Sequence, residues 1–182
     1  MALKVTPTRL PGVLVVEPRV FEDARGSFFE SFNARVFAEA TGVDATFVQD
    51  NQSSSLRNVL RGLHYQVEKP QGKLVRVLRG AIFDVAVDLR RSAPTFGQWV
   101  GVELTAENRR QLWVPPGFGH GFLATSDVAE VAYKTTEYWY GAHDRSLRWN
   151  DPSLGIDWPL DGEPLLAAKD IAAPLLADAE LY

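Results

Sequence analysis

The alternation of apolar and polar residues every second position is the feature that most constrains the fold. In AIFDVAVDLR (81–90), Ala81, Phe83, Val85, Val87 and Leu89 would share one face, opposite Asp84, Asp88 and Arg90. Successive side chains of a strand point to opposite faces, so this pattern predicts a half-buried strand. Comparable runs occupy 74–79, 98–104, 110–115 and 130–140.

Turn-forming stretches separate these runs. They read RSAPTFG, TAEN, PPGFGHG and TSD, and the Arg79-Gly80 step predicts a tight connection. Gly, Pro, Asn and Asp favour turns. Many short strands at this spacing predict an all-β sandwich or barrel such as a jelly roll. No internal repeat or linker divides the chain, so we expect one domain over residues 1–182.

Helical structure is predicted in two places. In NARVFAEATG, Asn33 can cap the start of a helix, Phe37 belongs to its apolar face, and Gly42 can end it. Residues 150–182 are rich in Pro and Ala. There we expect loops with one or two short helical pieces.

Composition excludes several classes of function. The net charge of −4 and the pI of about 5.4 argue against nucleic acid and membrane surfaces as partners. The absence of cysteine excludes disulfides, thiolate chemistry and Cys-ligated zinc. We find neither a secretion signal at the N-terminus nor an apolar run of about 18 residues, so we expect a cytoplasmic protein.

The stretch RGLHYQ (61–66) contains one of the three histidines. Small cupin barrels bind metal through a His-x-His pair, because alternate strand residues share a face. Here Gln66 stands in the second position, and amides are poor ligands for transition metals, so no metal site is expected. A hydrogen-bonded core histidine is an alternative. The concentration of Arg61, His64, Lys73 and the polar run QDNQSSS instead favours a pocket of convergent polar groups.

Two aromatic stretches have both structural and functional interpretations. FEDARGSFFESF (21–32) could be an amphipathic strand with a turn, or an aromatic platform with a cation suited to a flat base and a phosphate. In YKTTEYWY (133–140), Tyr133 and Trp139 would share one strand face, opposite Tyr138 and Tyr140. Aromatic residues are common in strands whatever the function.

At these positions the chain resembles the dTDP-4-dehydrorhamnose 3,5-epimerase family, from about residue 5 to the C-terminus. The resemblance rests on FEDARGSFFESF, VQDNQSSS, VLRGLHYQ, PQGKLVRVLRGAIFDVAVDLRRSAPTFGQW, QLWVPPGFGHGF, AYKTTEYW, RWNDPSLGIDWP and AAKD. It implies a cupin-type jelly roll that is dimeric and needs neither metal nor cofactor. The implied reaction inverts C3 and C5 of dTDP-4-keto-6-deoxyglucose, giving dTDP-4-keto-rhamnose.

The resemblance also implies four catalytic roles. His64 would remove a proton next to the ketone, with Asp170 fixing its tautomer. Tyr133 would protonate the opposite face of the ring, and Lys73 would stabilise the enolate oxygen. The residue spacing alone does not pair His64 with Asp170.

Substrate-binding positions follow from the same resemblance. Phe21, Arg25, Phe28 and Glu30 would reach thymidine and phosphate across the dimer, from the partner's N-terminal region. Polar groups for the diphosphate and sugar would come from Gln49, Asn51, Ser53, Arg61 and His120. Tyr138 and Trp139 would complete the binding site.

One departure from the family leaves alternatives open. Many members have Tyr-Tyr where this chain has Tyr138-Trp139. Substrate scope could therefore differ, and a C3-only or C5-only epimerase of an antibiotic-sugar pathway is one alternative. A metal-dependent cupin isomerase or oxygenase is another, and a non-catalytic nucleotide-sugar binder is a third.

Overall fold

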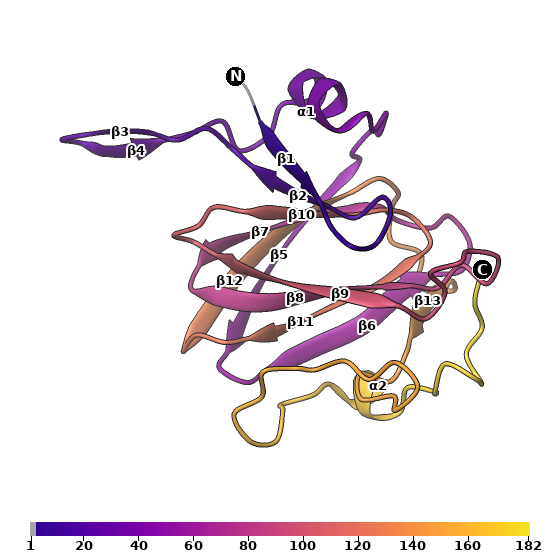
Figure 1. Cartoon of the computed structure of the whole chain (residues 1–182). Helices are drawn as coiled ribbons and strands as arrows, with labels where there is room; N and C mark the ends of the chain where they lie inside the picture. Colours follow the sequence, from indigo (N-terminus) through magenta and orange to yellow (C-terminus); the bar gives the residue numbers. More distant parts are fainter. Residues whose placement is uncertain (1–2) are drawn as a thin grey trace.

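Two antiparallel sheets face each other in the computed structural model, which describes residues 3–182 (Figure 1). The six-stranded sheet has the order β1-β2-β10-β7-β12-β5, and the five-stranded sheet has the order β13-β6-β11-β8-β9. The first comprises β1 (Lys4–Pro7), β2 (Leu14–Glu17), β10 (Gln111–Val114), β7 (Lys73–Arg79), β12 (Val128–Thr135) and β5 (Gln49–Leu56). The second comprises β13 (Asp144–Ser146), β6 (Leu60–Gln66), β11 (Phe118–Ala124), β8 (Ala81–Asp88) and β9 (Trp99–Thr105). The predicted jelly roll is confirmed.

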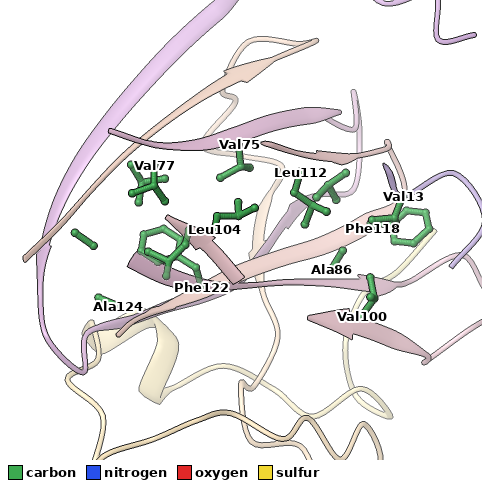
Figure 2. Close-up of a cluster of buried hydrophobic side chains, with 14 of the residues drawn as sticks. Val13, Val75, Val77, Ala86, Val100, Leu104, Leu112, Phe118, Phe122 and Ala124 are labelled. Atoms are coloured by element: carbon green, nitrogen blue, oxygen red, sulfur yellow. The ribbon is translucent and has the colours of Figure 1, made fainter. Parts of the chain in front are cut away.

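The largest buried cluster lies between these sheets (Figure 2). Val75 and Leu112 extend from the six-stranded sheet towards Ala86 and Phe122 of the other. Burying one large apolar side chain contributes roughly 1.5–3 kcal/mol. This shared core therefore holds the two sheets in fixed relation, and with them the side chains that each presents to the interior.

Strand β8 differs from the prediction for 81–90, because both of its faces are buried. Ile82 belongs to the inter-sheet cluster, whereas Val85 packs in a second cluster with Leu154 and Trp158. The C-terminal segment covers the outer face of the five-stranded sheet (Figure 1). Asp84 shares the inter-sheet face with Ile82 and Ala86 and is fully buried there, although the alternation placed it on a solvent-facing side.

Strand β12 ends at Thr135, five residues short of the predicted strand over 130–140. The Thr135 hydroxyl donates a hydrogen bond to the carbonyl oxygen of Glu137 (2.9 Å), which accompanies the exit from the sheet. Residues 138–140 therefore lie outside the ladder, and their side chains do not alternate with Tyr133 as predicted.

Both predicted helical regions are confirmed. Helix α1 (Ala34–Thr41) begins after Asn33, whose side chain accepts a hydrogen bond from the amide of Val36, and ends at Gly42 with a φ of 71°. Its Phe37 packs against Trp113 of β10 with 5.7 Å between ring centroids. Helix α2 (Ala168–Ile171) lies in the C-terminal segment. Neither helix is long or apolar enough to cross a membrane.

The hairpin of β3 (Phe21–Asp23) and β4 (Gly26–Phe28) projects away from the two sheets (Figure 1). Every residue of both strands is exposed, including Phe28 with 64% of its surface accessible. Large exposed apolar side chains on an extended hairpin are typical of an interaction surface.

Candidate active site

A cavity of about 490 Å³ is lined by residues from both sheets and from the C-terminal segment. It brings together all four residues for which the family resemblance implies a catalytic role. It also contains several of the predicted binding residues. The sequence-predicted residues that line it are His64, Lys73, Tyr133, Asp170, Ser53, Arg61, His120 and Trp139.

His64 and Asp170 form a direct pair, although they are 106 positions apart. His64 Nε2 lies 2.6 Å from Asp170 Oδ1, and Asp170 Oδ2 accepts a hydrogen bond from the Gly62 amide (3.4 Å). Burial lowers the pKa of His64, and Asp170 partly opposes this shift. A neutral imidazole that donates through Nε2 has a free lone pair on Nδ1, which suits a general base.

Two glycines allow the backbone beneath His64 to pass close to its neighbour. A Cβ atom on Gly62 would lie 2.5 Å from the Cα atom of Gly121, and Gly62 has a φ of 129°. Only glycine tolerates both the contact and the backbone angle. The close approach of β6 and β11 places His64 directly opposite His120 in the strand register.

His120 forms a second histidine–carboxylate pair. Its Nε2 atom lies 2.7 Å from Oδ1 of the fully buried Asp84. Within residues 3–182, Oδ2 of Asp84 has no hydrogen-bond partner. Sequence reasoning missed Asp84, because the alternation pattern assigned it to an exposed strand face.

Lys73 supplies a buried cation from β7 of the opposite sheet. Its ammonium group donates to the carbonyl oxygen of His64 at 3.4 Å. Burial lowers the pKa of Lys73 to about 8, while Asp144 and Asp84 act in the other direction. Lys73 is therefore mostly protonated at neutral pH, and it can stabilise negative charge that develops in the cavity.

Tyr133 projects from β12, in the sheet opposite His64. Burial raises the pKa of its phenol. The hydroxyl therefore carries its proton at neutral pH, as a proton donor requires. A base from one sheet and an acid from the other could act on opposite faces of a ring held between them.

Asp144 and Lys169 also line the cavity and were not predicted. Lys169 Nζ donates to Asp144 Oδ2 at 3.1 Å. The position of Lys169 next to Asp170 was an available signal, since both belong to the AAKD motif. Asp144 stands beside His143 in GAHD, where no spacing pattern marked it as a cavity residue.

The remaining predicted residues lie outside this cavity in the single chain. Phe21, Arg25 and Phe28 are on the projecting hairpin, where Arg25 pairs with Asp23 at 2.5 Å. Glu30 accepts a hydrogen bond from Asn33 next to α1 (3.3 Å). The other residues of this group are Asn51, which lines a separate groove, Gln49 and Tyr138.

Trp139 was predicted to point towards the pocket as an alternate residue of a strand with Tyr133. It does line the cavity with Tyr133, but from the segment beyond the strand. Its amide donates to Oε1 of Gln49 (3.0 Å), and Gln49 Nε2 donates to Asn51 Oδ1 (3.0 Å). The Oε1 and Nε2 atoms of Gln49 are therefore both hydrogen-bonded to other residues of the chain.

Comparison with known proteins shows that the chain is similar, over nearly its whole length, to members of one family. A sequence model described as dTDP-4-dehydrorhamnose 3,5-epimerase matches residues 7–178. A Pseudomonas aeruginosa protein of that name is 57% identical over 180 residues, covering 99% of both chains. The Streptomyces niveus dTDP-4-dehydrorhamnose 3-epimerase is 40% identical, covering 97% of this chain and 86% of its own.

Among solved structures, the Legionella pneumophila dTDP-6-deoxy-D-glucose-3,5-epimerase in complex with dTDP-4-keto-L-rhamnose superposes with a TM-score of 0.96. It is 49% identical, and the match covers 98% of this chain and 95% of that one. With full-length matches in both sequence and structure, the chain belongs to the dTDP-4-dehydrorhamnose 3,5-epimerase family.

Proposed function

We propose that this chain inverts C3 and C5 of dTDP-4-keto-6-deoxyglucose to give dTDP-4-keto-rhamnose, without a metal or cofactor. One observation carries the proposal. The His64–Asp170 pair and Tyr133 come from different elements, yet they line one cavity of about 490 Å³. That volume is within the range of small-molecule sites.

The first half of each inversion is proton removal. Neutral His64 takes the proton from the carbon next to the ketone through Nδ1, while Asp170 stabilises the imidazolium that forms. The electrons of the broken C–H bond move onto the ketone oxygen. Lys73 stabilises the resulting enolate from its buried position.

The second half is protonation from the other side. Tyr133 donates its phenolic proton to the same carbon, and the enolate electrons return to form the new C–H bond. Solvent then restores the proton of Tyr133 and removes the one on His64. The same cycle at the other carbon adjacent to the ketone completes the double inversion.

Turnover in D₂O followed by NMR tests the proposal. We expect deuterium at both C3 and C5 of the product, because each new C–H bond receives a solvent-derived proton. Activity should persist after incubation with EDTA and dialysis. Absence of exchange at either carbon, or chelator-sensitive turnover, would contradict the double epimerase or the metal-free mechanism respectively.

A C3-only epimerase is the second candidate. It is supported by the 40% identity to the Streptomyces niveus 3-epimerase, and it ranks second because the identity to the Pseudomonas aeruginosa 3,5-epimerase is higher, at 57%. The unusual Trp139 at the cavity adds to this alternative. Deuterium confined to C3 would establish it.

We also propose that the active unit is a homodimer in which each hairpin of β3 and β4 reaches its partner. The hairpin and the outer face of the six-stranded sheet are the supporting features. That face has a groove of about 560 Å³, in which Phe32, Leu74 and the exposed Leu78 stand among several charged and amide side chains. Phe21, Arg25, Phe28 and Glu30 would contact the nucleotide bound to the other chain.

Sedimentation velocity tests the association directly. The chain has a mass of 20.2 kDa, and we expect a single species of twice that mass at micromolar concentration. Leu78→Glu should shift the equilibrium towards monomer by replacing an exposed apolar side chain of this groove with a charge. A monomeric wild-type protein with full activity would refute the dimer.

A further inference from the structure

Gln66 is buried at the end of β6, two residues after His64, and its side chain is fully occupied. Its Oε1 atom accepts a hydrogen bond from the amide of Tyr140 (2.8 Å). Its Nε2 atom donates to the carbonyl oxygens of Tyr138 (3.2 Å) and Lys69 (3.0 Å). Only 2% of Gln66 is exposed, so these bonds have little competition from water.

These bonds replace the sheet ladder for residues 138–140, because β12 ends at Thr135. The Trp139 amide is bonded to Gln49 Oε1 on the other side of the segment. Gln66 and Gln49 therefore hold the segment from two directions. Trp139 lies between the two anchored residues, lines the cavity and keeps 60% of its surface exposed.

The side-chain amide of Gln66 makes the bonds to residues 138–140, so these bonds depend on which residue stands at position 66. The carbonyl oxygen of Gln66 separately accepts a bond from the hydroxyl of Tyr182 (2.7 Å). Any residue at position 66 retains that backbone bond. A side-chain substitution should consequently release residues 138–140 while leaving the attachment of the C-terminal segment to β6 intact.

We propose that Gln66 is a positioning residue for substrate binding, which holds Trp139 at the cavity before the nucleotide sugar arrives. The inference rests on the proposed function. A segment that is already ordered avoids an entropic cost on binding, so its release should weaken affinity more than it slows chemistry. Gln66 itself has no contact with the catalytic His64–Asp170 pair among the hydrogen bonds of residues 3–182.

Gln66→Met tests the inference, because it removes all three bonds and keeps a side chain of similar length. We expect KM to rise about 10-fold, which corresponds to the free energy of one or two lost hydrogen bonds. The value of kcat should change less than about 2-fold. Assays should run well below the melting temperature of the variant. A fall in kcat with unchanged KM would overturn the proposal.

A double-mutant cycle with Trp139→Ala separates positioning from general structural support. If Gln66 acts through Trp139, adding Gln66→Met to Trp139→Ala should change KM by less than about 2-fold. If Gln66 supports the barrel generally, its full effect persists in the double variant. That result would also overturn the inference.

Asn108→Ala is the matched control. The Asn108 amide also makes three backbone bonds, to Glu103, Thr105 and Arg110 in the turn between β9 and β10. Its loss should lower the melting temperature and leave KM unchanged. If Asn108→Ala raised KM as much as Gln66→Met, a specific role for Gln66 would be refuted.

Calorimetric measurement of dTDP-glucose binding distinguishes a failure of the proposed function from a failure of the role proposed for Gln66. This nucleotide sugar has no ketone, so its affinity does not depend on turnover. We expect the Kd to rise about 10-fold in Gln66→Met, by the same loss of preorganisation. An inactive wild-type protein would defeat the proposed function, whereas an unchanged Kd in Gln66→Met would defeat this inference alone.

Discussion

His64 and His120 face each other directly across β6 and β11, and each imidazole is bonded through Nε2 to a carboxylate. The two pairs differ in access. The side chain of His64 is 25% exposed, against 7% for His120. A base must reach its substrate, so this asymmetry favours His64 for proton abstraction and leaves His120 for binding.

Replacing His64 should therefore remove the base without removing the cavity. We expect His64→Asn to lower kcat by roughly 10²–10⁴, the usual contribution of general base catalysis. Solvent deuterium exchange should fall equally. His143→Asn is the control, because His143 lies 3.6 Å from Glu68 outside the cavity. Near-normal turnover by the His64 variant would contradict the assigned role.

Tyr133→Phe should separate proton removal from inversion. The variant keeps His64 and Lys73, so deuterium exchange into recovered substrate should continue. Product formation should fall about 100-fold, because no acid remains on the opposite face. The measurement is the ratio of exchange to epimerisation by NMR. Equal loss of both would argue that Tyr133 acts in proton removal instead.

The pH dependence of kcat/KM should be bell-shaped. Neutral His64 is the active form, and burial keeps its pKa below 6.5, so activity should rise as pH increases through that lowered value. Protonated Lys73 is the active form, so activity should fall as pH passes about 8. Tyr133 has a raised pKa and keeps its proton across this range.

Lys73→Arg provides the check on the alkaline limb. Guanidinium remains charged far above pH 8, so the decline should move to higher pH even if the maximum is lower. An alkaline limb at the same pH in this variant would assign it to another group.

Mixing two inactive variants tests whether the hairpin acts on the partner. Arg25→Ala with Phe28→Ala disables the hairpin, and His64→Asn disables the base. In a hybrid dimer, one site combines an intact cavity with the intact hairpin of the other chain. Co-refolding should restore up to about a quarter of wild-type activity, from statistical pairing. No recovery would place the hairpin contacts within one chain.

The general architecture followed from local sequence patterns. Asn33 and Gly42 defined α1 correctly, and the two-residue period predicted the jelly roll. The burial of Asp84 could not be predicted in this way. Alternation reports one covered face, and it carries no information that the other face, which Asp84 shares with Ile82 and Ala86, lies between the two sheets.

The contact between His64 and Asp170 was equally inaccessible to spacing arguments. Only the family resemblance joined His64 to Asp170, because the contact spans 106 positions and depends on how the C-terminal segment returns to β6. Trp139 shows the opposite case. Strand periodicity correctly predicted that Trp139 faces the cavity, but the predicted cause was wrong. Trp139 lies beyond the end of β12, and hydrogen bonds to the loop backbone place it at the cavity.

The location of Asp170 on α2, within a segment of little regular structure, has a consequence for how activity is acquired. The C-terminal segment packs on the outer face of the five-stranded sheet, so the contact between Asp170 and His64 requires that sheet to be in place. A refolding chain should accordingly regain its β-sheet signal ahead of its catalytic power. Recovery of activity during refolding would then report when the C-terminal segment has packed onto the folded barrel.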